Sequence, residues 1–288
     1  MRMPSRGRVF TVCSSFIIWH RVVNCADSWS TDRNGKHGRK SMQQTVLTAL
    51  RVLDEVARRQ PVGVSQLAKS MDMPKSTMQR ILRALEAADW IRQAEGRSGG
   101  WILTTKPIDI SRYVTADVGL REHSRSAMAA LRDETGESVH LAVREGSEVV
   151  VVEVEESSSP VRIYWPAGTR SACHASANGK AILAQLSSDE IASVLGRDLT
   201  GFTSATITEV DRLHQELGLV RSRGYALAEG ELREDIASIA AAIIGPSGRP
   251  LGSISVFLPR LRLSADGIHE LGDKTRAAAD SISRKFRA

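Results

Sequence analysis

Hydrophobic residues recur at helical spacing in two segments near the start of the chain, residues 43–59 and 75–87. In the first segment they repeat every three or four positions, which predicts one buried helix face made of Val46, Leu47, Leu50, Leu53, Val56 and Ala57. Pro61 and Gly63 end this helix, and Ser65 stands where the N-cap of a short helix over 66–71 is expected.

The second segment follows a tight turn at residues 72–74. Its predicted inward-facing residues are Met78, Ile81, Leu82 and Leu85. Three helices, the last two joined by a tight turn, are the plan of a helix-turn-helix. Residues 90–93 and 101–104 then read as strands around the glycine-rich run 96–100, so we expect a β-hairpin that forms a wing.

The pattern changes in the rest of the chain to short alternating runs mixed with helical ones. A long helical stretch over 108–135 ends at Gly136. We expect strands at 139–143, 148–153, 161–165, 236–244 and 251–258, and helices at 176–186, 188–195, 208–223 and 264–286. Hairpin-paired strands with helices packed beside them make this an α+β domain.

These patterns divide the chain into four parts. We expect a disordered tail at 1–40, rich in Arg, Ser, Gly and Asn, with Met42 as a candidate start of translation. A winged helix-turn-helix domain at 41–106, a linker helix at 107–117 and a larger domain at 118–288 follow. At 288 residues and 42% hydrophobic, the chain is long enough to bury two cores.

Charge and cysteine usage add little to this picture. Residues 1–117 hold 19 Lys and Arg against 10 Asp and Glu, but residues 1–40 alone hold 8 against 2, so charge does not establish DNA binding. Cys13, Cys25 and Cys173 form no paired framework, so we expect free thiols in the reducing cytoplasm. No apolar run approaches the roughly 18 residues of a membrane span.

A helix-turn-helix presents the N-terminal part of its last helix to the major groove, so the outer face there should be small, polar or basic. The outer face of helix 75–87 carries Lys75, Ser76, Thr77, Gln79, Arg80 and Arg83. Ser76 and Thr77 suit phosphate groups at the positive end of the helix. Gln79 and Arg80 have the reach and the donor geometry for adenine and guanine edges.

Other basic residues suit the phosphate backbone of double-stranded operator DNA, namely Arg83, Arg97 and Lys106. The alternative is that this face is solvated on a generic helical bundle, and that the chain is a protein-interaction or assembly module with no small-molecule effector. Salt dependence separates the two, because binding through phosphates weakens steeply as salt rises.

Several separated blocks of sequence resemble the isocitrate lyase regulator (IclR) family of transcriptional regulators, over nearly everything after residue 42. The blocks are 64–68 (VSQLA), 73–82 (MPKSTMQRIL), 135–142 (TGESVHLA), 174–181 (HASANGKA), 223–226 (RGYA) and 238–241 (SIAA). The resemblance implies a regulator whose second domain is GAF-like, with a curved antiparallel sheet that encloses a pocket for a small organic effector, often a carboxylate.

The resemblance also implies which segments line that pocket. The first is the helix start with Ala177, Asn178 and Gly179, whose backbone N–H groups could hold a carboxylate. The second is the run from 228 to 238, with Glu229, Glu231 and Ser238. The third is the last long strand, where Ser253, Ser255 and Phe257 alternate on one face.

Two departures from the family pattern bear on the effector. Phe257 stands where some members carry serine, and Ala228 where some carry aspartate. Both favour a larger, partly apolar effector over a very small polar acid. The alternative for the strand is that Ser253 and Ser255 are ordinary strand residues and that Phe257 is core.

The residues that could form a catalytic or metal site do not favour an enzyme. Cys173 and His174 are adjacent, and on an extended strand they would point to opposite faces. Metal binding through these two and His140 would lack a second tight ligand pair. We therefore expect no catalytic residue, no metal and no cofactor. We do expect a homodimer that pairs two DNA readers, and the family also forms tetramers.

Overall fold

The computed structural model describes residues 38–95, 99–114, 119–196 and 198–287. Its contacts divide the chain into two compact units, Met1–Thr104 and Thr105–Ala288. The predicted disordered tail, 1–40, falls outside the described residues except for 38–40, which belong to a helix. No helix among the described residues is long and apolar enough to cross a membrane.

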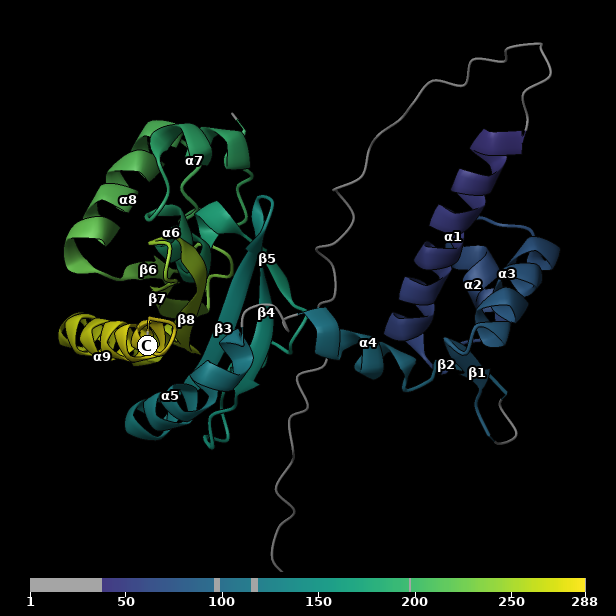
Figure 1. Ribbon diagram of the computed structural model, residues 1–288, viewed down its shortest axis with the longest axis horizontal. Helices are drawn as coiled ribbons and strands as arrows, with labels where there is room; N and C mark the ends of the chain where they lie inside the picture. Colours follow the sequence, from purple (N-terminus) through teal and green to yellow (C-terminus); the bar gives the residue numbers. More distant parts are fainter. Residues whose placement is uncertain (1–37, 96–98, 115–118, 197, 288) are drawn as a thin grey trace, which may run out of the picture. The chain divides into compact units, whose positions relative to one another are not determined.

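The N-terminal unit has the predicted winged helix-turn-helix (Figure 1). Its elements are α1 (Gly38–Arg59), α2 (Val64–Ser70), α3 (Lys75–Ala87), β1 (Ile91–Gln93) and β2 (Trp101–Leu103). The two strands are antiparallel, with Arg92 opposite Ile102. The cap of α2 is Gly63 rather than Ser65, and the Gly63 N–H donates to Gln66 Oε1 at 3.0 Å.

The apolar face predicted for α1 is only partly buried. Val56 lies in the core with Val52, but Val46, Leu47 and Leu50 are 55%, 52% and 53% exposed. Helical spacing shows that these residues share a face and does not show what covers that face. The middle of α1 therefore carries an exposed apolar stripe, made of these three residues.

The C-terminal unit is built on an antiparallel sheet with strand order β5-β4-β3-β8-β7-β6. The strands are β3 (Ser138–Glu145), β4 (Glu148–Glu155), β5 (Arg170–Ala172), β6 (Ala226–Glu229), β7 (Ile236–Ile244) and β8 (Pro250–Pro259). The helices are α4 (Lys106–Val114), α5 (Leu120–Thr135), α6 (Ala177–Leu183), α7 (Ser188–Leu195), α8 (Val210–Arg223) and α9 (Ala265–Lys285). The predicted α+β class is confirmed.

Two local predictions were wrong. The stretch 108–135 is not one helix, because Gly119, at φ 58°, starts α5 separately from α4. Residues 161–165 are not a strand. Prolines flank them, and two of their carbonyls accept from side chains: Val161 O from Arg262 at 2.6 Å and Ile163 O from Ser138 Oγ at 3.1 Å.

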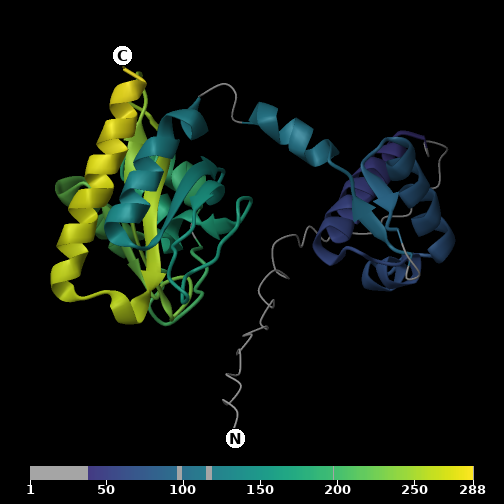
Figure 2. The same ribbon diagram turned by 90° about the horizontal axis from the view of Figure 1, so that it is seen from below.

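The sheet separates two layers of helix. Helices α5 and α9 lie side by side on one face (Figure 2), where Leu131 and Ile282 pack on Leu141 and Val256. The other face packs against α6, α7 and α8, and its core includes Ala142, Ala226 and Ala240 from the sheet. All seven residues of α6 are buried, so this helix fills the hollow of the sheet.

One glycine permits this close packing. A Cβ added at Gly179 would lie 2.6 Å from the carbonyl carbon of Cys173 and closer still to its Cα. Backbone cannot give way as the end of a flexible side chain can, so α6 passes Cys173 only because position 179 has no side chain.

We therefore predict that Gly179→Ala lowers the free energy of unfolding by about 1–3 kcal/mol or more, as overpacking does. The measurement is urea unfolding of the full chain. The matched control is Gly218→Ala on α8, where a Cβ meets nothing within 4 Å. That change should stabilise by about 0.5–1 kcal/mol through helix propensity, and equal effects of the two substitutions would contradict the role given to Gly179.

Candidate functional site

The outer face of α3 is the first candidate site. Lys75, Ser76, Gln79, Arg80 and Arg83 are exposed, and Thr77 is half-buried. The opposite face, with Met78, Ile81, Leu82 and Leu85, is buried as predicted. The turn before the helix is held by the Met73 N–H, which donates to Ala68 O at 2.9 Å.

The wing lies next to the middle of α3. Gln79 and Arg83 line a hollow together with Gln93 and Trp101 from the two wing strands. The isolated bridge between Val62 and Trp101 ties β2 to the segment that follows α1. Arg97, the predicted wing contact, lies outside the described residues.

The second candidate site is a pocket in the C-terminal unit. Its lining joins the segment before α6, the β6–β7 connection and the sheet, and consists of Trp165, Ala175, Ser176, Ala228, Glu231, Leu232, Arg233, Ile236, Ser238 and Phe257. Three of the predicted effector residues are brought together here, namely Glu231, Ser238 and Phe257. The cavity volume is about 10 Å³, which is room for about one water molecule.

The other predicted effector residues do not line this pocket. Glu229 alternates with Ala228 on β6 and is ion-paired with Arg260 at 2.9 Å on the half-exposed side. Ser253 and Asn178 are buried and hydrogen-bonded to each other at 2.9 Å, which ties α6 to β8.

The remaining three are also committed to packing. Ala177 and Gly179 lie in the buried α6, and the Gly179 N–H donates to Ser176 Oγ at 3.2 Å. The Ser255 hydroxyl donates to the backbone carbonyl of His140 at 3.3 Å.

Glu231 forms a polar wall of the pocket and belongs to a buried ion pair with Lys180, which lies outside the lining. Lys180 is 1% exposed, and its Nζ lies 2.5 Å from Glu231 Oε1. Burial raises the pKa of Glu231 above its ordinary value, and the Lys180 ammonium opposes that rise. The second carboxylate oxygen, Glu231 Oε2, is buried and has no hydrogen-bond partner among the described residues.

Two threonines fix the backbone that carries Glu231. Thr206 Oγ1 donates to Glu231 O at 2.6 Å, and Thr203 Oγ1 donates to Gly230 O at 2.7 Å. Both come from the segment before α8, so the wall is held from α6 on one side and from this segment on the other.

Cys173 and His174 serve packing rather than chemistry here. Burial raises the pKa of the Cys173 thiol to about 12, so the nucleophilic thiolate does not form at neutral pH. The His174 ring faces Phe202 at 6.0 Å, and its Nε2 lies 2.9 Å from Thr200 O.

Sequence reasoning missed Lys180, Trp165 and Arg233. Lys180 carried a usable signal, because it is the one charged residue between 177 and 183, in a segment of otherwise small, apolar or amide side chains that lies within the helix predicted over 176–186. Trp165 and Arg233 lie in irregular segments, where the periodicity of the sequence does not predict which way a side chain points.

Two family models match this chain. The family model described as "Bacterial transcriptional regulator IclR C-terminal" matches residues 112–284. A second, "Iron-dependent Transcriptional regulator", matches residues 40–157. Residues 40–157 contain no cysteine, and no cluster of three or more potential metal-ligating side chains occurs in the described parts of the chain, so the iron of that description does not fit these residues.

Individual proteins are similar over most of the chain. The HTH-type transcriptional regulator BhcR of Paracoccus denitrificans is 31% identical over 236 residues, 82% of this chain and 84% of that protein. The crystal structure of the Thermotoga maritima IclR is 25% identical, with a TM-score of 0.73 over 85% of this chain and 100% of that one. An IclR homologue complexed with 4-hydroxybenzoate from Microbacterium hydrocarbonoxydans, 21% identical, has the same fold, with a TM-score of 0.73 over 84% and 99% of the two chains.

Removal of Lys180 would leave Glu231 buried without its partner, and the stability of the protein would then depend on pH. A carboxyl whose folded pKa lies above its unfolded value stabilises the fold below the unfolded pKa, and this contribution is lost as pH rises through the folded pKa. We predict that the Lys180→Met protein is as stable as the wild type below pH 4.5, the ordinary Glu pKa, because Glu231 is then protonated and uncharged. At neutral pH the variant should be about 3–5 kcal/mol less stable than the wild type, because the charged Glu231 is buried and unpaired. Urea unfolding as a function of pH measures this.

The double variant Lys180→Met/Glu231→Gln should lose that pH dependence. Lys274→Met, which removes a lysine paired with exposed Glu270, should leave stability nearly unchanged, because exposed ion pairs contribute little. A Lys180→Met protein with the wild-type pH profile would contradict the account of the pair.

Proposed function

The protein belongs to the IclR family of bacterial transcriptional regulators, and from this premise we propose that α3 reads operator DNA under the control of a small organic effector bound in the C-terminal pocket. The observation that carries the proposal is the exposed polar and basic face of α3 beside a wing. Ser76 and Thr77 would contact phosphates at the helix N-terminus. Gln79 and Arg80 would contact base edges, and Arg83 and Arg97 the phosphate backbone.

The same proposal includes a dimer. The apolar stripe of Val46, Leu47 and Leu50 is more than half exposed, and Ile108 of α4 is 65% exposed. The three residues of the stripe lie together on one helix, and contiguous exposed apolar residues favour association. A two-fold pair of helix-turn-helix units would read two half-sites, which one unit alone does not.

The pocket composition supports an effector with an apolar or aromatic body and an acidic head. Trp165, Leu232 and Phe257 supply the apolar wall. Arg233 lies at the lining, and its guanidinium donates to both carboxylate oxygens of Asp235, at 3.3 and 3.1 Å. Both side chains are exposed, so this pair is weak and a ligand carboxylate could take the place of Asp235. The structure with 4-hydroxybenzoate gives a precedent for such a molecule in a protein of this fold.

For the DNA-reading half, we predict that Arg80→Ala weakens operator binding by about 1–3 kcal/mol, the value of a bidentate base contact. The measurement is fluorescence anisotropy on a fragment selected from genomic DNA, repeated over a range of salt concentrations. Binding that does not weaken with salt would favour the protein-interaction alternative.

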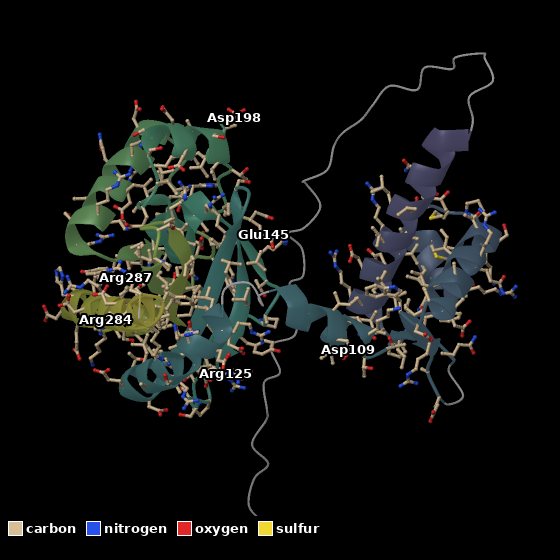
Figure 3. The ribbon with its side chains drawn as sticks, in the orientation of Figure 1. Asp109, Arg125, Glu145, Asp198, Arg284 and Arg287 are labelled. Carbon is tan, nitrogen blue, oxygen red and sulfur yellow. The ribbon has the colours of Figure 1, made fainter. Side chains whose placement is uncertain are left out.

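The matched control is Arg284→Ala, which removes the same charge from α9 in the C-terminal unit (Figure 3). It should leave operator affinity unchanged. An equal loss in the two variants would mean that total charge, not the position of Arg80, governs binding.

For the effector half, we predict that some members of a panel of small carboxylic and aromatic acids raise the melting temperature of the protein, because a ligand of the folded state stabilises it. Arg233→Ala should weaken binding of those acids about tenfold or more, since a hydrogen bond to a charged group is worth about 1.5–3 kcal/mol.

Arg249→Ala is the matched control, because Arg249 is also an exposed arginine paired with a carboxylate, that of Glu190. It should leave the acid-induced shift intact. If no acid in the panel stabilises the wild type, the effector half is contradicted and the C-terminal unit is better described as an assembly module.

A further inference from the structure

A buried imidazole without a partner lies behind the pocket. His140, on β3, is 0% exposed. Both ring nitrogens are buried, and no described residue forms a hydrogen bond with either. The hydroxyl of Ser255, directly opposite His140 on β8, is engaged with the His140 backbone carbonyl. Buried polar groups are nearly always hydrogen-bonded, so this ring requires an explanation.

The Phe257 ring separates His140 from the pocket. Its centroid is 4.4 Å from that of His140 and 5.1 Å from that of Trp165, and both Phe257 and Trp165 line the pocket. Phe257 lies two residues after Ser255 on β8 and therefore shares its face. Phe257 thus contacts both Trp165, which lines the pocket, and His140, which does not belong to the lining.

The state of the imidazole specifies what can bind it. Burial lowers the pKa of His140 to about 4, so the ring is neutral at physiological pH. A neutral imidazole offers one N–H donor and one acceptor nitrogen. A hydroxyl group both donates and accepts and can meet either nitrogen, whereas an ionised carboxylate can only accept from the N–H and would lose its hydration in this buried site.

We propose that His140 is the inner hydrogen-bonding residue of the pocket and takes a neutral hydroxyl group of the effector, reached when the Phe257 side chain turns aside. This rests on the proposed effector function and makes it more specific, because the ligand then carries a hydroxyl at the end opposite its acidic head. The small cavity is consistent with this arrangement, since an aromatic body needs the volume that Phe257 occupies.

The test uses the full chain and a pair of probes that differ in one polar group, phenol and toluene. Phe257→Ala removes the ring that covers His140 and leaves an apolar cavity of the kind that binds small aromatic molecules. Dissociation constants from calorimetric titration should then favour phenol by about tenfold, because only phenol can pair with the imidazole. In Phe257→Ala/His140→Leu the order should reverse, because toluene costs less to remove from water.

Phe286→Ala supplies the matched control. It also removes a phenylalanine packed on a histidine, His123 at 4.8 Å, but that ring already has a partner, with its Nδ1 2.7 Å from Gly119 O. No preference for phenol should appear there. Three outcomes would each overturn the assignment. They are equal binding of toluene and phenol by Phe257→Ala, a preference for phenol that survives in Phe257→Ala/His140→Leu, and no binding of either probe by Phe257→Ala.

Phe257→Leu, which removes less volume, replaces Phe257→Ala if the latter does not unfold cooperatively. Operator binding of the same variants without any probe is measured in parallel. If neither the wild type nor any variant binds DNA, the proposed function is refuted. The comparison of phenol and toluene would still test the role of His140, because it does not depend on DNA binding.

Discussion

The C-terminal unit depends on the burial of one short helix in the hollow of its sheet. Every residue of α6 is buried, although the helix carries an asparagine and a lysine. Small side chains on the sheet, such as Ala142 and Ala240, make room for it, and Gly179 lets its backbone approach that of Cys173. Close packing of this kind fixes the helix position to within the size of a methyl group. The groups on α6 are therefore placed as firmly as the sheet itself.

Burial of α6 dictates the polar groups around it. A buried ammonium is tolerated only when it is paired and hydrogen-bonded, so Lys180 requires the carboxylate of Glu231. Glu231 in turn is held through its backbone by Thr206. Asn178 meets the Ser253 hydroxyl for the same reason. The polar wall of the pocket is thus a consequence of how the helix packs, and a ligand meets a surface whose geometry is set before it binds.

Local patterns were enough to predict the N-terminal unit, because α3, its buried face and the wing each follow from residues a few positions apart. They were not enough for the stripe on α1, since periodicity gives a face without its covering partner. The pocket lining depends on non-local packing. Alternation correctly put Ser255 and Phe257 on one face of β8, but only Phe257 reaches the pocket. The packing of α6 decides which residues of β8 reach the pocket, and no pattern along the β8 sequence predicts that packing. Residues 161–165 alternate like a strand, yet prolines and side-chain donors take the hydrogen bonds that a strand would need.

The size of the pocket constrains how the sensor can work. A cavity of about 10 Å³ does not accept an aromatic molecule, so the conformation that binds one is a minor state of the free protein, and the apparent affinity is reduced by the fraction of protein in that state. An effector that displaces Phe257 acts on β8, whose other face packs through Val256 against the core that α5 and α9 share. Packed cores change by discrete rearrangement more readily than by continuous deformation. A displacement of Phe257 at the pocket can therefore be passed through β8 to α5, which packs on the same strand. The effector can change DNA affinity only by the difference between its affinities for the two arrangements. A ligand that fits without moving Phe257 would therefore bind and leave the regulator unchanged.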